Sequence, residues 1–320
     1  MSVILVNDYL FGMLGEEKVL WNYMLDNIDN LKGVDNDIIK NNNQYDYNLS
    51  FEENVSKYIK NNYPNCKLII QNSLIGLIPI NIKKIVLIQD NYRKMNINHG
   101  IQENCFLCAD EVVTNSDEID LYYNERKCVQ IPLGIDNELF CNSNYNNKKD
   151  LRNILDLPTY NYNKFGIFVG CFNEVKGWKT MNDIINRRKD IFWILVTKFE
   201  NDNFISNNSR VYNKINQGLL VKLLNASDFF ILPSPSESQC LSAIEANLCN
   251  IPTIMRKTGY FTNLNQEEID KVGIITDKFI DEDIDLIYKK SFSPREIILK
   301  KYSIQNMIEK WNNLIQKVIN

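Results

Sequence analysis

Residues 228–246 read DFFILPSPSESQCLSAIEA. The apolar run Phe229–Leu232 has the length and the residue types of a buried strand, and a proline ends it. A loop of Ser, Pro and Glu follows, and Leu241–Leu248 are good helix formers. We expect Ser236 or Ser238 to cap this helix, because a short side-chain oxygen can accept hydrogen bonds from the free N–H groups at a helix start. The stretch therefore predicts a strand, a loop and a helix in immediate succession.

A helix that follows a strand in this way begins at the carboxyl edge of the sheet, where open α/β folds bind their ligands. Its start at Cys240 and Leu241 presents free N–H groups and the positive end of the helix dipole, which together bind anions. Glu237 and Glu245 flank this anion site. A carboxylate repels phosphate but accepts hydrogen bonds from sugar hydroxyls, so we expect a sugar next to the anionic group. A surface loop with a helix-capping acid is the alternative.

The spacing Glu-x7-Glu, between a strand that ends in Pro-Ser and a helix that reads Glu-Ala, resembles the signature of the family-4 retaining glycosyltransferases (glycosyl transferase group 1). This resemblance implies the GT-B fold, in which two Rossmann-like α/β domains face each other across a cleft and a C-terminal helix crosses back to the first domain. It also implies that the second domain holds the nucleotide. Glu237 is then the catalytic residue by the donor sugar, and Glu245 binds the ribose.

A second predicted anion site lies in the sequence FGIFVG-CFNEVKGW, residues 165–178. A strand that ends at Gly170, followed by Lys176 at a helix start, places an ammonium beside free N–H groups, which suits a diphosphate. The family pattern here is Gly-Arg-x4-Lys-Gly, with both cations on the diphosphate. Cys171 replaces the arginine, and loss of such a charge costs about 3 kcal/mol of transition-state stabilisation. Either another cation compensates, or the enzyme is slow, or the chain is not an enzyme.

The first half of the chain contains two further candidate site residues, Gln89 and Gly15. The apolar run 85–88 leads to Gln89, where the family usually has a catalytic His beside the donor sugar. Glutamine donates and accepts hydrogen bonds but carries no proton charge, so we expect no side-chain base there. The resemblance implies that the departing phosphate oxygen takes the acceptor's proton instead. Near the N-terminus, Gly15 lies in a turn that resembles the family's glycine loop over the donor phosphates.

The alternation of strand and helix patterns predicts two domains of the α/β class. We expect an acceptor domain at 1–157, a nucleotide-sugar domain at 158–302 and a crossover helix at 303–320 that packs on the first domain. Residues 141–163, rich in Asn, Lys and Tyr, are expected to connect the domains, and a short strand is expected at 37–40 in an exposed connection. Further strand candidates are Val3–Val6, Lys67–Gln71, Glu111–Thr114, Cys128–Ile131, Phe192–Thr197 and Val272–Ile275.

The composition is that of an ordinary globular protein: 320 residues, 44% hydrophobic and 24% charged. A net charge of −4 gives no reason to expect a nucleic-acid partner. The eight cysteines form no disulfide framework, and neither a signal peptide nor a transmembrane segment is expected, so a cytoplasmic location is predicted. The donor substrate would be a UDP- or GDP-sugar, with no cofactor and no metal.

The predicted function is therefore a retaining, metal-independent glycosyltransferase that moves a sugar from a nucleotide sugar to a glycan or another hydroxyl acceptor. A nucleotide-sugar-binding protein of the same fold with little or no turnover is the alternative, because Cys171 and Gln89 depart from the family pattern. An epimerase or a phosphorylase of the same fold is a second alternative, with little support from the first-half motifs.

Overall fold

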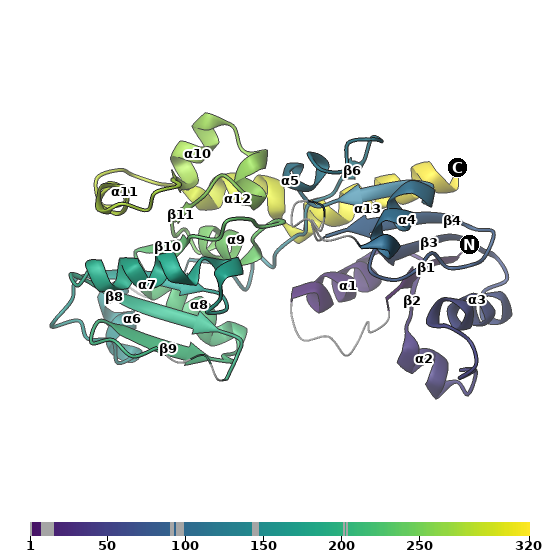
Figure 1. The fold of residues 1–320 in the computed structure, drawn as a ribbon, viewed down its shortest axis with the longest axis horizontal. Coiled ribbons are helices and arrows are strands. Elements are labelled where there is room, and N and C mark those ends of the chain that lie inside the picture. Colours follow the sequence, from purple (N-terminus) through teal and green to yellow (C-terminus); the bar gives the residue numbers. More distant parts are fainter. Residues whose placement is uncertain are drawn as a thin grey trace. The chain divides into compact units, whose positions relative to one another are not determined.

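The structure is a computed structural model, and it describes residues 2–7, 16–89, 93, 99–142, 147–200, 202 and 204–320. The chain forms two compact units. One comprises Met1–Gly134 together with Ile304–Asn320, and the other comprises Ile135–Ser303. Each unit contains a six-stranded parallel sheet with helices packed on it (Figure 1). The prediction of a two-domain α/β chain is confirmed.

The sheet of the first unit has the strand order β2-β1-β3-β4-β5-β6, with every neighbouring pair parallel. Its strands are β1 (Ser2–Val6), β2 (Leu31–Val34), β3 (Cys66–Asn72), β4 (Lys83–Ile88), β5 (Glu111–Thr114) and β6 (Val129–Gln130). Its helices are α1 (Glu16–Asn27), α2 (Asn36–Asn41), α3 (Phe51–Asn62), α4 (Gly100–Cys108), α5 (Asp117–Asp120) and α13 (Ile304–Ile319). The central strands are continuous apolar runs because helices cover both faces of the sheet.

The closing helix α13 belongs to the first unit. It buries a single apolar face, as its helical periodicity predicts; the buried residues are Met307, Ile308, Trp311, Leu314, Ile315 and Val318. The ammonium of Lys83, at the start of β4, donates to the carbonyl oxygen of Val318 at 2.6 Å. This bond satisfies one of the carbonyls that the end of a helix leaves free.

The short strand expected at 37–40 is wrong. These residues lie in helix α2, and the strand β2 precedes them at Leu31–Val34, where it pairs with β1. The side chain of Asp35 accepts a hydrogen bond from the backbone N–H of Ile38 at 2.8 Å and so caps the helix. The pair of isoleucines in this segment favours a strand, but the helix cap outweighs that local preference.

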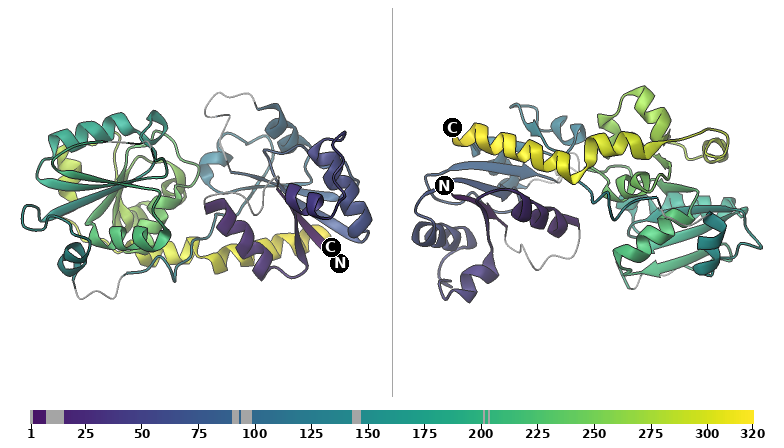
Figure 2. Two further views of the ribbon diagram at one scale, coloured as in Figure 1. Left: turned by 90° about the horizontal axis from the view of Figure 1, so that it is seen from below. Right: turned by 180° about the vertical axis from the view of Figure 1, so that it is seen from behind.

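The sheet of the second unit has the order β12-β11-β10-β7-β8-β9 and is also entirely parallel. Its strands are β7 (Lys164–Val169), β8 (Ile191–Thr197), β9 (Ser209–Asn213), β10 (Phe229–Leu232), β11 (Thr253–Met255) and β12 (Gly273–Ile275). Its helices are α6 (Lys148–Ile154), η1 (Glu174–Lys176), α7 (Trp178–Arg187), α8 (Gln217–Ala226), α9 (Leu241–Leu248), η2 (Gly259–Asn263), α10 (Gln266–Val272), α11 (Asp281–Leu286) and α12 (Pro294–Tyr302). Helices lie on either side of this sheet (Figure 2).

The expected domain boundary at 157/158 is wrong, and 141–163 is not a connection between the units. The chain passes into the second unit after Gly134, and Phe140, Leu151 and Leu157 are part of that unit's core. The guanidinium of Arg152 pairs with the carboxylate of Asp228 at 2.7 Å. The high content of Asn and Lys in this segment indicates an exposed connection when composition alone is considered. Its few apolar residues are nevertheless enough to pack α6 on the core.

The chain leaves the second unit beside the point where it enters it. Ile135 and Ser303 form a parallel bridge, and the backbone N–H of Ile135 donates to the carbonyl oxygen of Tyr302 at 2.9 Å. Within the part of the chain that the structure describes, no helix combines the length and the hydropathy that a membrane span requires.

Candidate functional site

Helix α9 begins at Leu241 directly after the loop that follows β10, as the sequence predicts. The predicted cap is wrong, because neither Ser236 nor Ser238 occupies the cap position. Cys240 does, with a left-handed φ of 67°, and its own side chain makes no capping hydrogen bond. A non-glycine residue in this conformation is uncommon and is often found at functional sites. The start of α9 thus presents backbone N–H groups that its own cap does not satisfy.

Lys176 and Glu237, which lie 61 residues apart in the chain, form an ion pair. The ammonium nitrogen of Lys176 lies 2.8 and 2.9 Å from the two carboxylate oxygens of Glu237. The side chain of Glu237 is only 8% exposed, and its backbone N–H donates to the hydroxyl of Thr258 at 2.8 Å. The structure therefore brings two of the predicted catalytic residues together at the start of α9.

The carboxylate of Glu237 stabilises the charge of the Lys176 ammonium. Burial opposes the charge of the Lys176 ammonium, but the Glu237 carboxylate outweighs it, and the pKa of Lys176 lies above its ordinary value. The lysine is therefore protonated at neutral pH. Burial, with the Glu237 carboxylate as the next contribution, raises the pKa of the Cys240 thiol far above its usual range. Cys240 is thus a neutral thiol at this site.

Two loops are held against each other to form this pair. The hydroxyl of Ser234 donates to the carbonyl oxygen of Val175 at 2.7 Å, which joins the loop after β10 to η1. Gly177, with φ 71°, follows Lys176, and a Cβ there would lie 2.2 Å from the carbonyl oxygen of Pro233. Only glycine permits so close an approach in this backbone conformation.

Gly170 and Gly259 border the same pair from two other loops. A Cβ at Gly170 would lie 3.4 Å from Cγ of Lys176, so the loop after β7 runs close to the lysine stem. Gly259 has φ 57°, and a Cβ there would lie 3.2 Å from Cβ of Glu237. Gly259 and Thr258 were not among the predicted site residues. They follow β11, a neighbour of β10, so their position at a strand end was the available signal.

Cys171, which replaces the expected arginine, is half-buried beside two lysines. Burial raises the pKa of the Cys171 thiol, and the positive charges of Lys198 and Lys176 partly offset this effect. Lys198 follows β8, the strand next to β7, and it too was missed by sequence reasoning. The negative charge of Asp202 raises the pKa of Cys171 and so acts against that of Lys198. The Asp202 carboxylate also accepts a hydrogen bond from the backbone N–H of Phe172 at 3.1 Å. The positive charge of Lys198 thus acts electrostatically at the position of the missing guanidinium.

Glu245 is buried in α9, about one and a half turns beyond the cap. Its carboxylate lies near the thiol of Cys249: burial first, and then the charge of Glu245, raises the pKa of Cys249 to about 12. Leu241, the first residue of the helix, is half-buried. The structure thus places all the predicted residues of the second unit on the loops and helices that follow β7 and β10.

Gln89, the predicted catalytic residue of the first unit, lies buried at the end of β4. Its side-chain oxygen accepts a hydrogen bond from the amide nitrogen of Asn72 at 3.1 Å, whereas its own amide nitrogen has no partner among the described residues. The side-chain oxygen of Asn115, which follows the neighbouring strand β5, likewise lacks a partner in the described part of the chain. The predicted ligand contact of Gly15 lies outside the described residues.

A buried donor and a buried acceptor that lack partners among the described residues occupy adjacent strand ends of the first unit. Buried polar groups of this kind are normally satisfied, so a pair of them at a ligand-binding edge suggests hydrogen bonds to a ligand. In the ranges that the structure describes, no group of three His, Cys, Asp or Glu residues is placed to hold a metal ion.

Comparison with known proteins gives the fold of the whole chain and a family match for part of it. Residues 200–301 match the model of the glycosyl transferases group 1, a range that includes Glu237, Cys240 and Glu245. No curated protein sequence is significantly similar to the chain. Sucrose-phosphate synthase (tll1590) from Thermosynechococcus elongatus is similar with a TM-score of 0.75 and 13% identity, over 99% of this chain and 98% of that chain. Alr3699/HepE of Anabaena in complex with UDP is similar with a TM-score of 0.79 and 14% identity, over 99% of this chain and 100% of that chain. A glycosyltransferase from Rickettsia africae is similar with a TM-score of 0.71 and 14% identity, over 100% of this chain and 98% of that chain.

The chain has the GT-B fold, since its two parallel sheets and their helices match these structures over nearly the full length of both chains. The family match over 200–301 confirms the resemblance to the group 1 glycosyltransferases and supports the prediction of glycosyl transfer. At 13–14% identity, the solved structures establish the fold and leave the substrates open.

Proposed function

We propose that this chain is a retaining, metal-independent glycosyltransferase that transfers a sugar from a nucleotide-sugar donor to a glycan or another hydroxyl acceptor. The observation that carries the proposal is the Lys176–Glu237 pair at the start of α9, where the cap residue Cys240 makes no side-chain capping hydrogen bond. The structures of HepE in complex with UDP and with UDP-glucose support a nucleotide sugar as the donor. A cytoplasmic location and the absence of a nucleic-acid partner stay predictions.

The donor diphosphate would bind between the N–H groups at Cys240 and Leu241 and the ammonium of Lys176. A lysine ammonium has three N–H donors, and Glu237 accepts from this nitrogen through two oxygens, which leaves a donor for phosphate. Glu237 keeps the ammonium charged and fixes its position. Preorganised charge of this kind acts where negative charge develops in the transition state.

Transfer breaks the bond between the anomeric carbon and the phosphate oxygen while the sugar acquires oxocarbenium character. The acceptor oxygen forms its new bond on the same face of the sugar, and its proton moves to the released phosphate oxygen. Gln89 contributes no base to this step. Its amide nitrogen and the side-chain oxygen of Asn115, which lack partners among the described residues, could bind the hydroxyls of a ligand of the first unit.

A donor panel tests the proposal. Incubation with UDP- and GDP-sugars and a set of oligosaccharide acceptors is expected to release a nucleoside diphosphate, with a product whose anomeric configuration, measured by NMR, equals that of the donor. Inversion of the anomeric centre would contradict the proposed mechanism. Binding of a nucleotide sugar without any product would instead support a binding protein with no turnover, the alternative that Cys171 favours by replacing a cation.

Replacing Glu245 with alanine is expected to weaken nucleotide binding, because the ribose hydroxyls lose a charged partner. Such a hydrogen bond contributes about 1.5–3 kcal/mol, so the Kd of the nucleoside diphosphate should rise roughly 10- to 150-fold in a calorimetric titration. Glu267→Ala, which removes an exposed carboxylate on α10, is the matched control and should leave the Kd unchanged. An unaltered Kd in Glu245→Ala refutes the assigned role.

Lys198→Ala is expected to lower kcat roughly tenfold, because a second cation near the departing diphosphate stabilises the developing charge from a more exposed position than Lys176. The effect should shrink as salt is added, since salt screens exposed charges. Lys222→Ala, which removes an exposed ammonium from α8, is the control for a general change in charge. Equal kcat values in the two variants would show that Lys198 does not replace the missing arginine.

A further inference from the structure

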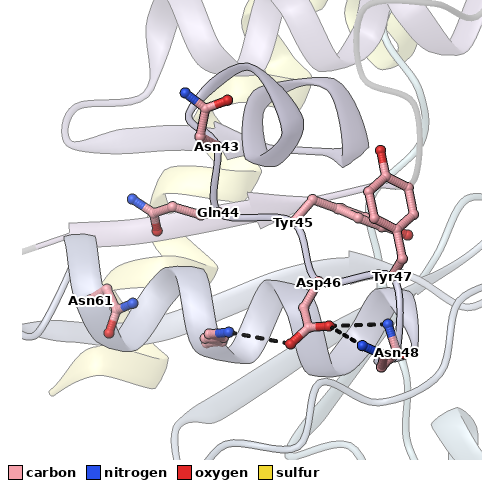
Figure 3. A pocket seen from close by; sticks show the side chains of 8 residues that line it. Asn43, Gln44, Tyr45, Asp46, Tyr47, Asn48 and Asn61 are labelled. Carbon is pink, nitrogen blue, oxygen red and sulfur yellow. Dashed lines mark hydrogen bonds and ion pairs between the residues drawn. The ribbon is translucent and has the colours of Figure 1, made fainter.

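A pocket in the first unit lies between α3 and the loop that connects α2 to α3, and it is built from residues that the proposed transfer does not use. Its volume is about 460 Å³, within the range of small-molecule sites. The rings of Tyr45 and Tyr47 lie at one end, the amides of Asn43, Gln44 and Asn61 lie at the other, and Asp46 lies between them (Figure 3). The residues that carry the argument are Asn43, Gln44, Tyr45, Asp46, Tyr47 and Asn61.

The loop is held in place by a buried asparagine. Asn54, on α3, accepts a hydrogen bond from the backbone N–H of Asp46 at 2.7 Å and donates to the carbonyl oxygens of Asp46 and Leu49 at 2.9 and 3.2 Å. The side-chain oxygen of Gln44 accepts from the amide of Asn62 at 2.9 Å. Both ends of the loop are therefore fixed to α3, so the pocket exists before any ligand binds, which reduces the entropic cost of binding.

This fixed loop presents an aromatic ring to solvent. Tyr47 is 84% exposed, and its ring lies edge-on to that of Tyr45, with 5.1 Å between the centroids. Tyr45 packs partly on the core below, which holds it in position. The negative face of a tyrosine ring attracts weakly positive C–H groups, and its hydroxyl remains free for hydrogen bonds, so such a ring suits an amphipathic ligand.

The charges in the pocket cancel. The ammonium of Lys57 lies 3.6 Å from the carboxylate of Asp46, which also accepts hydrogen bonds from the backbone and side-chain N–H groups of Asn48 at 3.0 and 3.2 Å. The backbone hydrogen bond from Asn48 is the main cause that lowers the pKa of Asp46, so this carboxylate is ionised at neutral pH. A phosphate would meet no unpaired cation among the lining residues.

We propose that this pocket binds a neutral saccharide unit of an extended glycan. A sugar ring has an apolar C–H face, which would stack on Tyr47, and hydroxyls that both donate and accept. The amides of Asn43 and Asn61 also carry donors and acceptors. This proposal does not depend on the transfer site, and glycan binding alone tests it.

An array of neutral oligosaccharides, probed with the full-length chain, tests the proposal. Wild-type protein is expected to bind at least one glycan, and Tyr47→Ala should weaken that binding tenfold or more. Tyr160→Ala removes an equally exposed ring (88%) from the second unit and should change nothing. The melting temperature of both variants should equal that of the wild type, because neither ring is buried.

Three results overturn the proposal: no neutral glycan binds, the two variants bind as the wild type does, or uridine binds in a Tyr47-dependent way while no saccharide does. Titration of a nucleoside diphosphate into Tyr47→Ala separates this question from the transfer site. The affinity of Tyr47→Ala for the nucleoside diphosphate should equal that of the wild type, whether or not the pocket binds glycans.

Discussion

Replacing Lys176 with alanine is expected to lower kcat by about a hundredfold or more, which corresponds to the roughly 3 kcal/mol that one preorganised charge contributes to a transition state. Two effects add in the same direction. The departing diphosphate loses its ammonium, and the Glu237 carboxylate, only 8% exposed, stays beside it without a partner. Release of nucleoside diphosphate under saturating donor measures kcat directly.

Lys179→Ala is the matched control, because it removes an exposed ammonium three residues further along, in α7. It should leave kcat unchanged. The affinity for the free nucleoside should also change little in Lys176→Ala, since the nucleoside lacks the phosphates that the lysine binds. If kcat and nucleoside affinity fall by the same factor, then Lys176 serves only to hold the loops together.

Gly177→Ala is expected to produce the largest loss of stability among substitutions at this site. The residue has φ 71°, and a Cβ would lie 2.2 Å from the carbonyl oxygen of Pro233, so either the strained turn opens or the two loops separate. Left-handed strain alone costs about 1–2 kcal/mol, and the clash adds to it. Urea denaturation should show a free energy of unfolding lower by roughly 2–4 kcal/mol. Activity should fall as well, because the turn carries Lys176.

Gly218→Ala provides the comparison for this experiment. This glycine lies near the start of α8, where a Cβ would meet only the side-chain oxygen of Asn216 at an ordinary 3.5 Å. Alanine there should leave stability unchanged or raise it, because alanine favours helix. Equal stability of the Gly177→Ala and Gly218→Ala proteins would mean that the contact with Pro233 is not maintained in solution.

The sequence alone predicts the elements around the site accurately. Strand β10 and helix α9 have the predicted bounds, because each combines an unambiguous composition with a proline-rich loop between them. The closing helix α13 is equally well predicted, since its period of buried residues runs over several turns. Local patterns of this kind suffice wherever burial and propensity agree.

Other features depend on contacts that no local pattern contains. Residues 135–157 belong to the second unit because Phe140, Leu151 and Leu157 pack in a core formed with strands that follow later in the sequence. The bond between Lys176 and Glu237 spans 61 residues, so the sequence could assign both to one ligand without showing that they pair with each other. The left-handed cap at Cys240 and the second ammonium at Lys198 follow likewise from tertiary structure.

Calorimetric titration with UDP, GDP and ADP tests the central claim most directly, because the claim concerns one diphosphate held by the start of α9 and by Lys176. The account predicts that one of the three nucleotides binds wild-type protein at a single site, and that Lys176→Ala binds it at least about tenfold more weakly, as expected for loss of a charged hydrogen bond. Failure of all three to bind, or equal affinity in the variant, would contradict it.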